Sequence, residues 1–373
     1  MNVMIAILII IAILLAELSQ NNAIYDIQTQ KTYCEYKNFF AVPYALSFCV
    51  LAGICFFCKS GTDMPVYVEL YSSFTTSDFS NLKFEIGDKI LFVFLHKFIK
   101  NPYVGIGIVK ILSIGLVYRS IYLVRNKIKI GLAVTSYITL LYVFNFHLIR
   151  MMLAIGLVFF ALSYEIIGKR LKCIILLAAA ICFHYSSCIV LLIYIVYLIF
   201  LNNFSVIKIL IMLLGMTFVY GNAIQIISAL TQIDIFSKYT TYEVVNATGS
   251  GMVQLVLFIP VMLILIKSYP KEKHDSFYQV AFFCGIMTFF TGSMGYVYSV
   301  IGRLTYYFYF FFVIYGAATP LKKNDIGIIF GKYKVNMSTL LIHMFLIMNM
   351  YIYFIVGNAF KTNGLLQYTT IFN

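Results

Sequence analysis

Long apolar stretches follow one another along almost the whole chain, and short polar turns separate them. An α-helix of about 20 apolar residues crosses a bilayer core of ~30 Å. Hydrophobic residues make up 62% of the chain and charged residues 11%, against about 25% charged residues in soluble domains. The pattern therefore predicts an all-α, polytopic integral membrane protein of about twelve transmembrane helices and excludes a soluble globular protein.

The predicted spans form a single transmembrane domain over residues 1–373. They cover residues 1–16, 39–58, 103–124, 130–147, 148–167, 172–200, 205–230, 251–266, 276–291, 297–319 and 337–356. Residues 59–102 form a long outer loop, in which residues 90–99 make a helix that is too short to span and is therefore interfacial or re-entrant. Residues 231–250 form a second outer loop.

The stretch over residues 172–200 fits either one long helix or two short helices broken at His184. Basic clusters decide between the two, because lysine and arginine favour the cytoplasmic side of a membrane. With one helix, the clusters at 267–273 and 322–334 fall outside. With a break, all four basic clusters fall inside. We therefore predict a broken or re-entrant helix pair around His184, with both chain termini outside.

The basic and sulfur-containing residues exclude two other classes of function. The net charge of +13 comes from lysines and arginines in short turns between apolar runs, which is a membrane pattern and indicates no nucleic-acid partner. Cys55 and Cys58 form a lone C-x-x-C with no further ligands in the surrounding sequence. A zinc or redox site needs more, so we expect no metal and no cofactor.

Two cations lie in apolar surroundings at matching positions. Arg150 begins one apolar stretch, His184 ends the next, and the basic turn 169–172 joins the two. Both side chains therefore lie toward the membrane face opposite that turn, and Arg303 lies near the same face in a later span. Charged groups at membrane depth are costly and indicate function. A guanidinium group binds phosphate bidentately, through two N–H donors to two oxygens. We therefore predict a ligand with a diphosphate head and a lipid tail.

Several short motifs, in order, resemble those of EpsG-like and Wzy-type polysaccharide polymerases. They are Gly61-Thr62-Asp63 with Tyr67 and Tyr71, Phe84-Glu85-Ile86-Gly87, Ile149-Arg150 with Leu153-Ala154, Phe183-His184 with Ser186, and Arg303 before an aromatic run. The resemblance extends from about residue 55 to 310. It departs at Lys59, where the family often has arginine, and at Met151, where it often has glutamine.

The resemblance implies polymerisation of undecaprenyl-diphosphate-linked oligosaccharide repeats at the outer face of the bacterial cytoplasmic membrane. The product would be an O-antigen, capsule or exopolysaccharide. The family is similar in architecture to GT-C glycosyltransferases and uses no nucleotide sugar. Its implied partners are the lipid-linked oligosaccharide, membrane lipid, and a chain-length regulator and a flippase of the same pathway.

Such chemistry needs a group that accepts the proton of the attacking hydroxyl and cations that stabilise the departing diphosphate. The predicted catalytic residues are His184, Asp63 and Glu85, and the predicted substrate-binding residues are Arg150, Arg303, Tyr67, Tyr71 and Lys59. Structural roles stay open for each of them: an arginine that snorkels, a histidine that satisfies a helix break, acids that fold a loop, and tyrosines at the membrane interface.

Two other functions also fit the sequence. A lipid-linked oligosaccharide flippase would share the basic cavity and the ligand, but the long acidic outer loop and the lack of internal repeats disfavour it. A membrane O-acyltransferase acting on polysaccharide would use His184 as its base, but the sequence displays no acyl-donor site.

Overall fold

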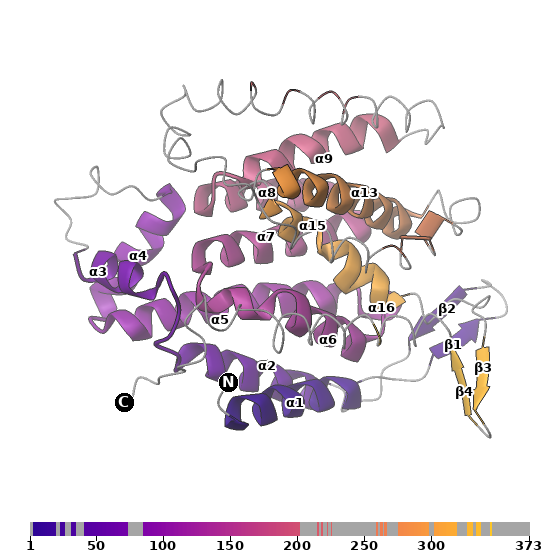
Figure 1. Ribbon diagram of the computed structural model, residues 1–373, viewed down its shortest axis with the longest axis horizontal. Coiled ribbons are helices and arrows are strands. Elements are labelled where there is room, and N and C mark those ends of the chain that lie inside the picture. Colours follow the sequence, from indigo (N-terminus) through magenta and orange to yellow (C-terminus); the bar gives the residue numbers. More distant parts are fainter. Residues whose placement is uncertain are drawn as a thin grey trace. The chain divides into compact units, whose positions relative to one another are not determined.

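The computed structural model is built almost entirely of helices (Figure 1). It describes residues 3–19, 23–26, 31–34, 41–73, 85–201, 275–297, 302–318, 327–330 and 333–336, with isolated positions between 215 and 344. The chain contacts define two compact units, one of Met1–Leu191 with Phe312–Asn373 and one of Leu192–Phe311.

Five helices of the first unit pack side by side in the order α1, α2, α5, α7 and α8 (Figure 1). They are α1 (Val3–Leu18), α2 (Ala41–Phe56), α5 (Pro102–Leu123), α7 (Ile149–Ile166) and α8 (Arg170–Phe183). Small and hydroxylated residues let α5 and α7 approach closely, as is common between membrane helices. A Cβ on Gly156 would lie 3.0 Å from the Ser113 carbonyl oxygen, and the Ser120 and Ser163 hydroxyls are 2.6 Å apart.

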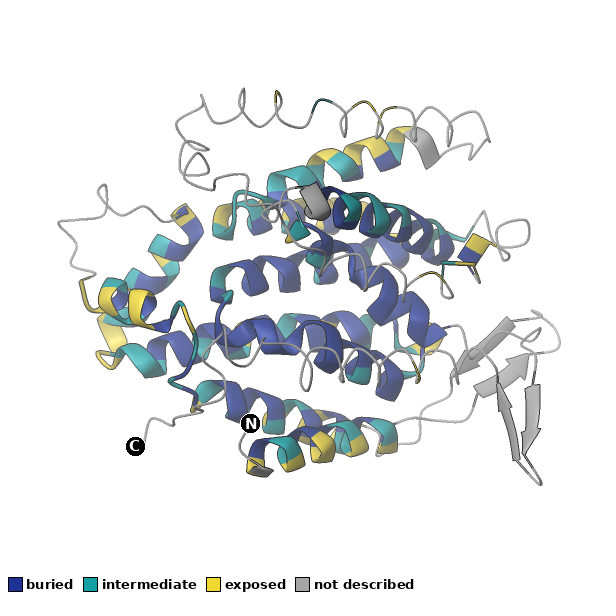
Figure 2. Ribbon diagram, viewed as in Figure 1, coloured by how far each residue is buried: buried dark blue, intermediate teal, exposed yellow. Residues whose placement is uncertain are grey.

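Burial distinguishes the centre of this helix layer from its outer helices (Figure 2). Most of α7 is buried, whereas α1 exposes large apolar side chains such as Ile7 and Leu14. Helices α5, α7 and residues Ser276–Met294 of α13 are long and apolar enough to cross a bilayer. Shorter apolar helices accompany them. Exposed apolar surface on such helices is where lipid replaces water, and the chain is an integral membrane protein.

The connection from α5 to α7 bends twice. A 3₁₀ turn, η1 (Arg125–Lys127), leads into α6 (Ile130–Leu140), and a second, η2 (Tyr142–Phe146), leads toward α7. The Tyr142 hydroxyl donates to the Leu51 carbonyl at 2.7 Å, and the Asn145 amide donates to the Tyr137 hydroxyl at 3.0 Å. These bonds satisfy polar groups that lipid cannot and fix η2 beside the end of α2.

Two further helices occupy the predicted outer loop. The helix α3 (Met64–Ser73) was not expected there, because the surrounding sequence is polar. It forms because Met64, Tyr67 and Tyr71 recur at helical spacing and are all buried. The helix α4 (Ile86–Phe98) covers the predicted short helix at residues 90–99, and its interfacial position stays a prediction.

The second unit contains α13 (Ser276–Val297), α15 (Thr305–Phe308) and most of α9 (Ser187–Leu201). Within it the Thr288 hydroxyl donates to the Phe308 carbonyl at 3.1 Å. The π-helical turn η4 (Phe311–Tyr315) and α16 (Gly316–Ala318) continue the chain. Within the predicted span at residues 297–319, the described residues 302–318 form a series of short helical pieces.

The helical architecture predicted from the sequence is confirmed. Two antiparallel hairpins in polar connections were not predicted: β1 (Ala23–Asp26) pairs with β2 (Lys31–Cys34), and β3 (Gly327–Phe330) pairs with β4 (Tyr333–Asn336). The count of twelve spans stays a prediction. The spans expected at 205–230, 251–266 and 337–356 and the outer loop at 231–250 lie outside the continuous described segments.

Candidate active site

Arg150 is the second residue of α7 and lies at the end of the helix layer where α3 and α4 also lie. A cation is unfavourable at a helix N-terminus, because the helix dipole places partial positive charge there. Two carboxylates compensate. The Arg150 guanidinium forms an ion pair with Glu85, and its Nη1 atom lies 3.9 Å from the Asp88 Oδ2 atom. The guanidinium is therefore held by the protein before any ligand arrives.

Glu85 and Asp88 reach Arg150 from the start of α4. Glu85 occupies the N-cap position and Asp88 lies in the first turn, where negative charge is stabilised by the helix dipole. Their spacing of three places both side chains on one face of the helix, and both residues are completely buried. Asp88 was not among the predicted site residues. The only signal for it was its i, i+3 spacing from Glu85, in a stretch predicted to be loop that precedes the helix expected at residues 90–99.

His184 lies beside Glu85 at the end of α8. Its Nδ1 atom lies 3.7 Å from the Glu85 Oε1 atom. The residue leaves helical geometry, with φ −156° and ψ 111°, and α9 begins three residues later at Ser187. The helix break predicted at His184 is therefore present, and Glu85 lies between Arg150 and His184.

A close approach of α4 to α8 makes this arrangement possible. A Cβ on Gly87 would lie 2.7 Å from the Cys182 carbonyl oxygen, a distance that real Cβ atoms essentially never show. Only glycine lets the first turn of α4 lie directly on the last turn of α8. The glycine in the Phe84-Glu85-Ile86-Gly87 motif thus sets the distance between the two carboxylates and His184.

Tyr67 completes the surroundings of Arg150. The Arg150 Nε atom donates to the Tyr67 hydroxyl at 3.3 Å, and the guanidinium lies 5.9 Å from the centre of the Tyr67 ring. Burial raises the pKa of the Tyr67 phenol, and the adjacent guanidinium offsets part of that rise. Tyr67 is therefore a neutral phenol at physiological pH and accepts a hydrogen bond as such.

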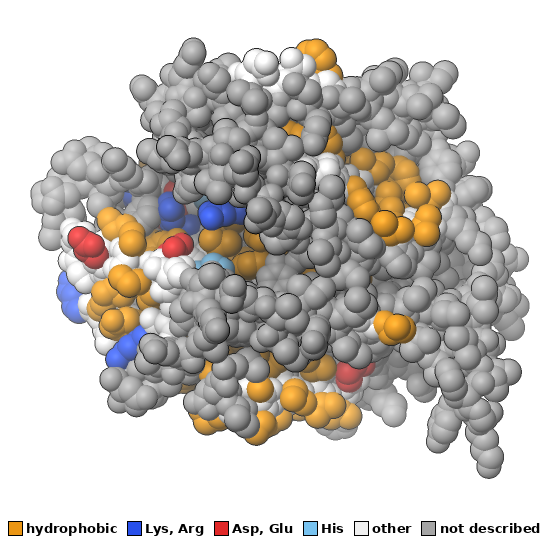
Figure 3. All heavy atoms as spheres, viewed as in Figure 1, with side chains coloured by type: hydrophobic (Ala, Val, Ile, Leu, Met, Phe, Trp, Pro, Cys, Tyr) orange, Lys and Arg blue, Asp and Glu red, His pale blue; other side chains and the backbone are white. Residues whose placement is uncertain are grey.

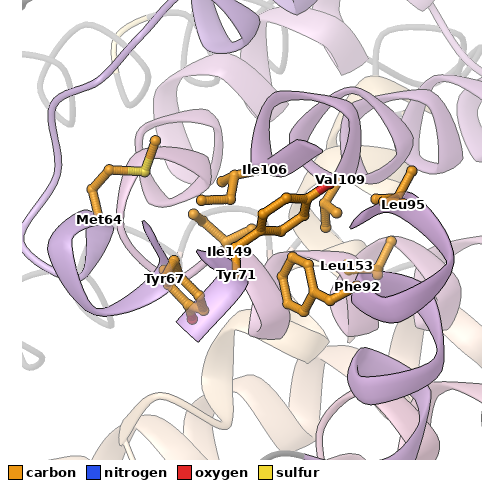
Figure 4. Close-up of a cluster of buried hydrophobic side chains, with 9 residues drawn as sticks. All are labelled: Met64, Tyr67, Tyr71, Phe92, Leu95, Ile106, Val109, Ile149 and Leu153. Carbon is orange, nitrogen blue, oxygen red and sulfur yellow. The ribbon is translucent and has the colours of Figure 1, made fainter. Parts of the chain in front are cut away.

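Tyr71 lies one helical turn further along α3 and points into an apolar cluster (Figure 4). It is fully buried, and its hydroxyl donates to the Ile99 carbonyl at 2.8 Å. Its ring packs against Phe92 at 5.8 Å and lies so close to Gly105 that a Cβ there would be 2.3 Å from it. Tyr71 holds α3, α4 and α5 together, and its predicted contact with substrate stays a prediction.

The remaining predicted residues have other surroundings. The Asp63 carboxylate accepts a hydrogen bond from Thr62 at 3.3 Å, and within the described residues it forms no ion pair. The Lys59 ammonium lies 5.3 Å from the centre of the Tyr103 ring. Arg303 is exposed at the turn before α15 and belongs to the second unit.

The group combines charges of both signs. Two buried carboxylates face one guanidinium, and His184 lies beside Glu85. Among the residues that the structure describes, no cluster of three metal-ligating side chains occurs. Basic and acidic side chains and a histidine also gather on the face that Figure 3 shows where α3 and α4 lie. The arrangement suits proton transfer and anion binding near a polar surface.

The four motif segments that carry Asp63, Glu85, Arg150 and His184 thus meet at one end of the first unit. A comparison with protein-family models matches the model described as the EpsG family over residues 40–370. The chain belongs to the EpsG family. A search of curated proteins and a search of solved structures each found no match.

Membership of the EpsG family gives the chain a role in polysaccharide biosynthesis as a glycosyltransferase-like polymerase. The match includes every candidate residue named above. It also includes both units, so that Arg303 belongs to the family region although it lies in the second unit.

Proposed function

We propose that this EpsG-family protein polymerises lipid-diphosphate-linked oligosaccharide repeats at the outer face of the bacterial cytoplasmic membrane. The observation that carries the proposal is the contact group of Arg150, Glu85, Asp88 and His184. It joins an anion-binding guanidinium to a histidine and two carboxylates at the polar end of apolar helices. The undecaprenyl carrier is the lipid that the family resemblance implies.

The reaction forms one glycosidic bond and breaks one sugar–phosphate bond. The terminal hydroxyl of the acceptor repeat attacks the anomeric carbon of the donor chain. The bond from that carbon to the diphosphate oxygen breaks, and its electron pair leaves with the lipid diphosphate. The hydroxyl proton passes to His184. Arg150 stabilises the negative charge that develops on the diphosphate, as preorganised cations do.

Glu85 links diphosphate binding at Arg150 to proton transfer at His184. In the structure it pairs with Arg150 and lies beside His184. A diphosphate that binds Arg150 displaces the Glu85 carboxylate from the guanidinium, since both anions use the same N–H donors. The released carboxylate then stabilises the imidazolium that forms when His184 takes the proton. Donor binding thereby prepares the base.

The outer location is supported by the two ends of the α7–α8 pair. Arg150 and His184 lie at one end. The basic turn lies at the other, where Arg170 pairs with Glu165 at 3.2 Å. Basic residues favour the cytoplasmic side, so the candidate site faces outward. A GT-C-like architecture with about twelve spans would place the lipid carrier beside these helices.

A reconstituted assay tests the proposal. Purified protein in liposomes receives a lipid-diphosphate-linked repeat unit, and the products are separated by length. We expect a ladder of polymers and release of lipid diphosphate in equal amounts. Transport of the repeat without ladder formation would favour a flippase, and modification of the sugar by an acyl donor would favour an O-acyltransferase. Either result would overturn the proposal.

A further inference from the structure

Lys110 is a lysine buried within a membrane-spanning helix, α5, and the site described above does not use it. It is 1% exposed. Its Nζ atom donates to the Cys58 carbonyl at 3.2 Å and lies 5.9 Å from the centre of the Phe146 ring. Within the described residues it forms no salt bridge. A cation buried at membrane depth is costly, so such a residue is expected to have a function.

The first partner of Lys110 is the segment that leaves α2. Helix carbonyls near a C-terminus carry partial negative charge and attract cations, and Cys58 lies two residues beyond the end of α2. One turn earlier on α5, Gly107 permits the approach: a Cβ there would lie 2.7 Å from the Phe56 ring and 3.0 Å from the Phe56 carbonyl oxygen. The ammonium therefore fixes the direction in which the chain leaves α2.

The second partner is the turn that enters α7. The departing chain crosses that turn at Gly61, whose φ is +144° and whose absent Cβ would lie 2.0 Å from the Phe146 carbonyl oxygen. No other residue fits there, because a side chain would overlap the Phe146 backbone and strain its own. Lys110 thus donates to the Cys58 carbonyl on one segment and lies 5.9 Å from the centre of the Phe146 ring on the other, next to their crossing.

The crossing matters for the candidate site because each of the two segments leads into a helix that carries a site residue. The segment that passes Gly61 begins α3, which carries Tyr67, and the turn at Phe146 begins α7, which carries Arg150. The Tyr67–Arg150 hydrogen bond joins the two segments again. We propose that Lys110 is a positioning residue that fixes the crossing of residues 58–64 over residues 142–148 and thereby sets the place of Arg150 and Tyr67 in the candidate site.

Hydrogen–deuterium exchange on the full-length protein tests the crossing without any substrate. Lys110→Met removes the charge and the donor at similar length, and Lys110→Gln keeps a shorter, neutral donor. We expect amides in 58–64 and 142–148 to exchange about tenfold faster in Lys110→Met, with an intermediate increase in Lys110→Gln. Amides of α8 should be unchanged. Lys97→Met, at an exposed lysine of α4, is the matched control and should exchange as the wild type does.

A kinetic measurement tests the consequence for the site, and this part rests on the proposed function. Arg150 remains present in Lys110→Met but is no longer held in place. We therefore expect kcat/KM for the lipid-linked donor to fall by about 10–100-fold. Lys110→Gln should recover part of the loss, which a general loss of stability would not produce.

The outcomes separate the two proposals. Folded Lys110→Met with wild-type exchange in both segments would overturn the positioning role. If Lys110→Met does not fold, unchanged exchange in Lys110→Gln overturns it instead. Faster exchange at the crossing, in a protein whose wild type forms no polymer, supports the positioning role and rejects the proposed function.

Discussion

Arg150 is the residue on which the candidate site depends most. Its planar guanidinium contacts Tyr67, Glu85 and Asp88 at once, and a lysine ammonium cannot reproduce that fork. We expect Arg150→Lys to lower polymer yield by at least about tenfold. Arg150→Ala should also destabilise the protein by about 3–5 kcal/mol, because it leaves buried carboxylates without their cation.

Polymer ladders at matched protein levels measure the first effect, and thermal unfolding in detergent measures the second. Arg119→Lys is the control, because Arg119 is exposed on α5 and contacts only the Tyr122 ring among the described residues. Normal ladders from both Arg150 variants would remove this arginine from the site.

The proposed role of His184 as a base predicts how the polymerisation rate depends on pH. A histidine that accepts the hydroxyl proton must be neutral, so the rate should fall as the pH drops and the imidazole becomes protonated. His184→Gln should lose most of its turnover and keep binding of the lipid diphosphate. The rate of polymerisation in liposomes between pH 5 and 8, about the range in which histidine titrates, measures the profile. A rate that instead falls as pH rises would identify an imidazolium that binds the diphosphate.

At the scale of elements, the contact between α4 and α8 is the most restrictive. Gly87→Ala places a methyl group 2.7 Å from the Cys182 carbonyl oxygen, so α4 must move away and carry Glu85 and Asp88 from His184. We expect lower polymer yield and a lower unfolding temperature. Gly53→Ala in α2 is the matched control, because nothing lies within 4 Å of its Cβ and alanine favours helix by about 1 kcal/mol. Equal behaviour of the two variants would contradict this account of α4.

The elements also show where sequence reasoning succeeded. Charge parity placed a break at His184, and the structure ends α8 at Phe183. The same reasoning missed α3, because a polar stretch suggested a loop although Met64, Tyr67 and Tyr71 recur at helical spacing. It missed Asp88 for the same reason, since an i, i+3 pair has meaning only once the segment is known to be a helix.

At the scale of the whole molecule, topology follows from the ends of α7 and α8. Thr62 and Lys169 are both exposed and belong to opposite ends of the first unit. In intact cells, a membrane-impermeant maleimide should label Thr62→Cys, and it should label Lys169→Cys only after permeabilisation. Labelling of both from one side would reject the outward orientation of the candidate site.

Contacts between helices that are distant in the sequence limited how much of the candidate site could be predicted from the sequence. That Arg150 and His184 share one end could be predicted, because two helices joined by the basic turn must run antiparallel. That Glu85 bridges them could not, because α4 approaches through Gly87 at a distance that no local pattern encodes. The place of Arg303 relative to Arg150 was predicted from topology alone, and Arg303 belongs to the second unit.

The two carboxylates around Arg150 also affect which anions can bind to its guanidinium. The guanidinium already pairs with Glu85 and lies near Asp88, so chloride, sulfate and inorganic phosphate must displace a carboxylate to reach it. Small anions gain too little to enter. The lipid diphosphate that we propose as ligand would differ, because it brings more charge and its tail concentrates it in the membrane. Under the proposed function, inorganic phosphate added to the liposome assay should therefore leave polymerisation unchanged.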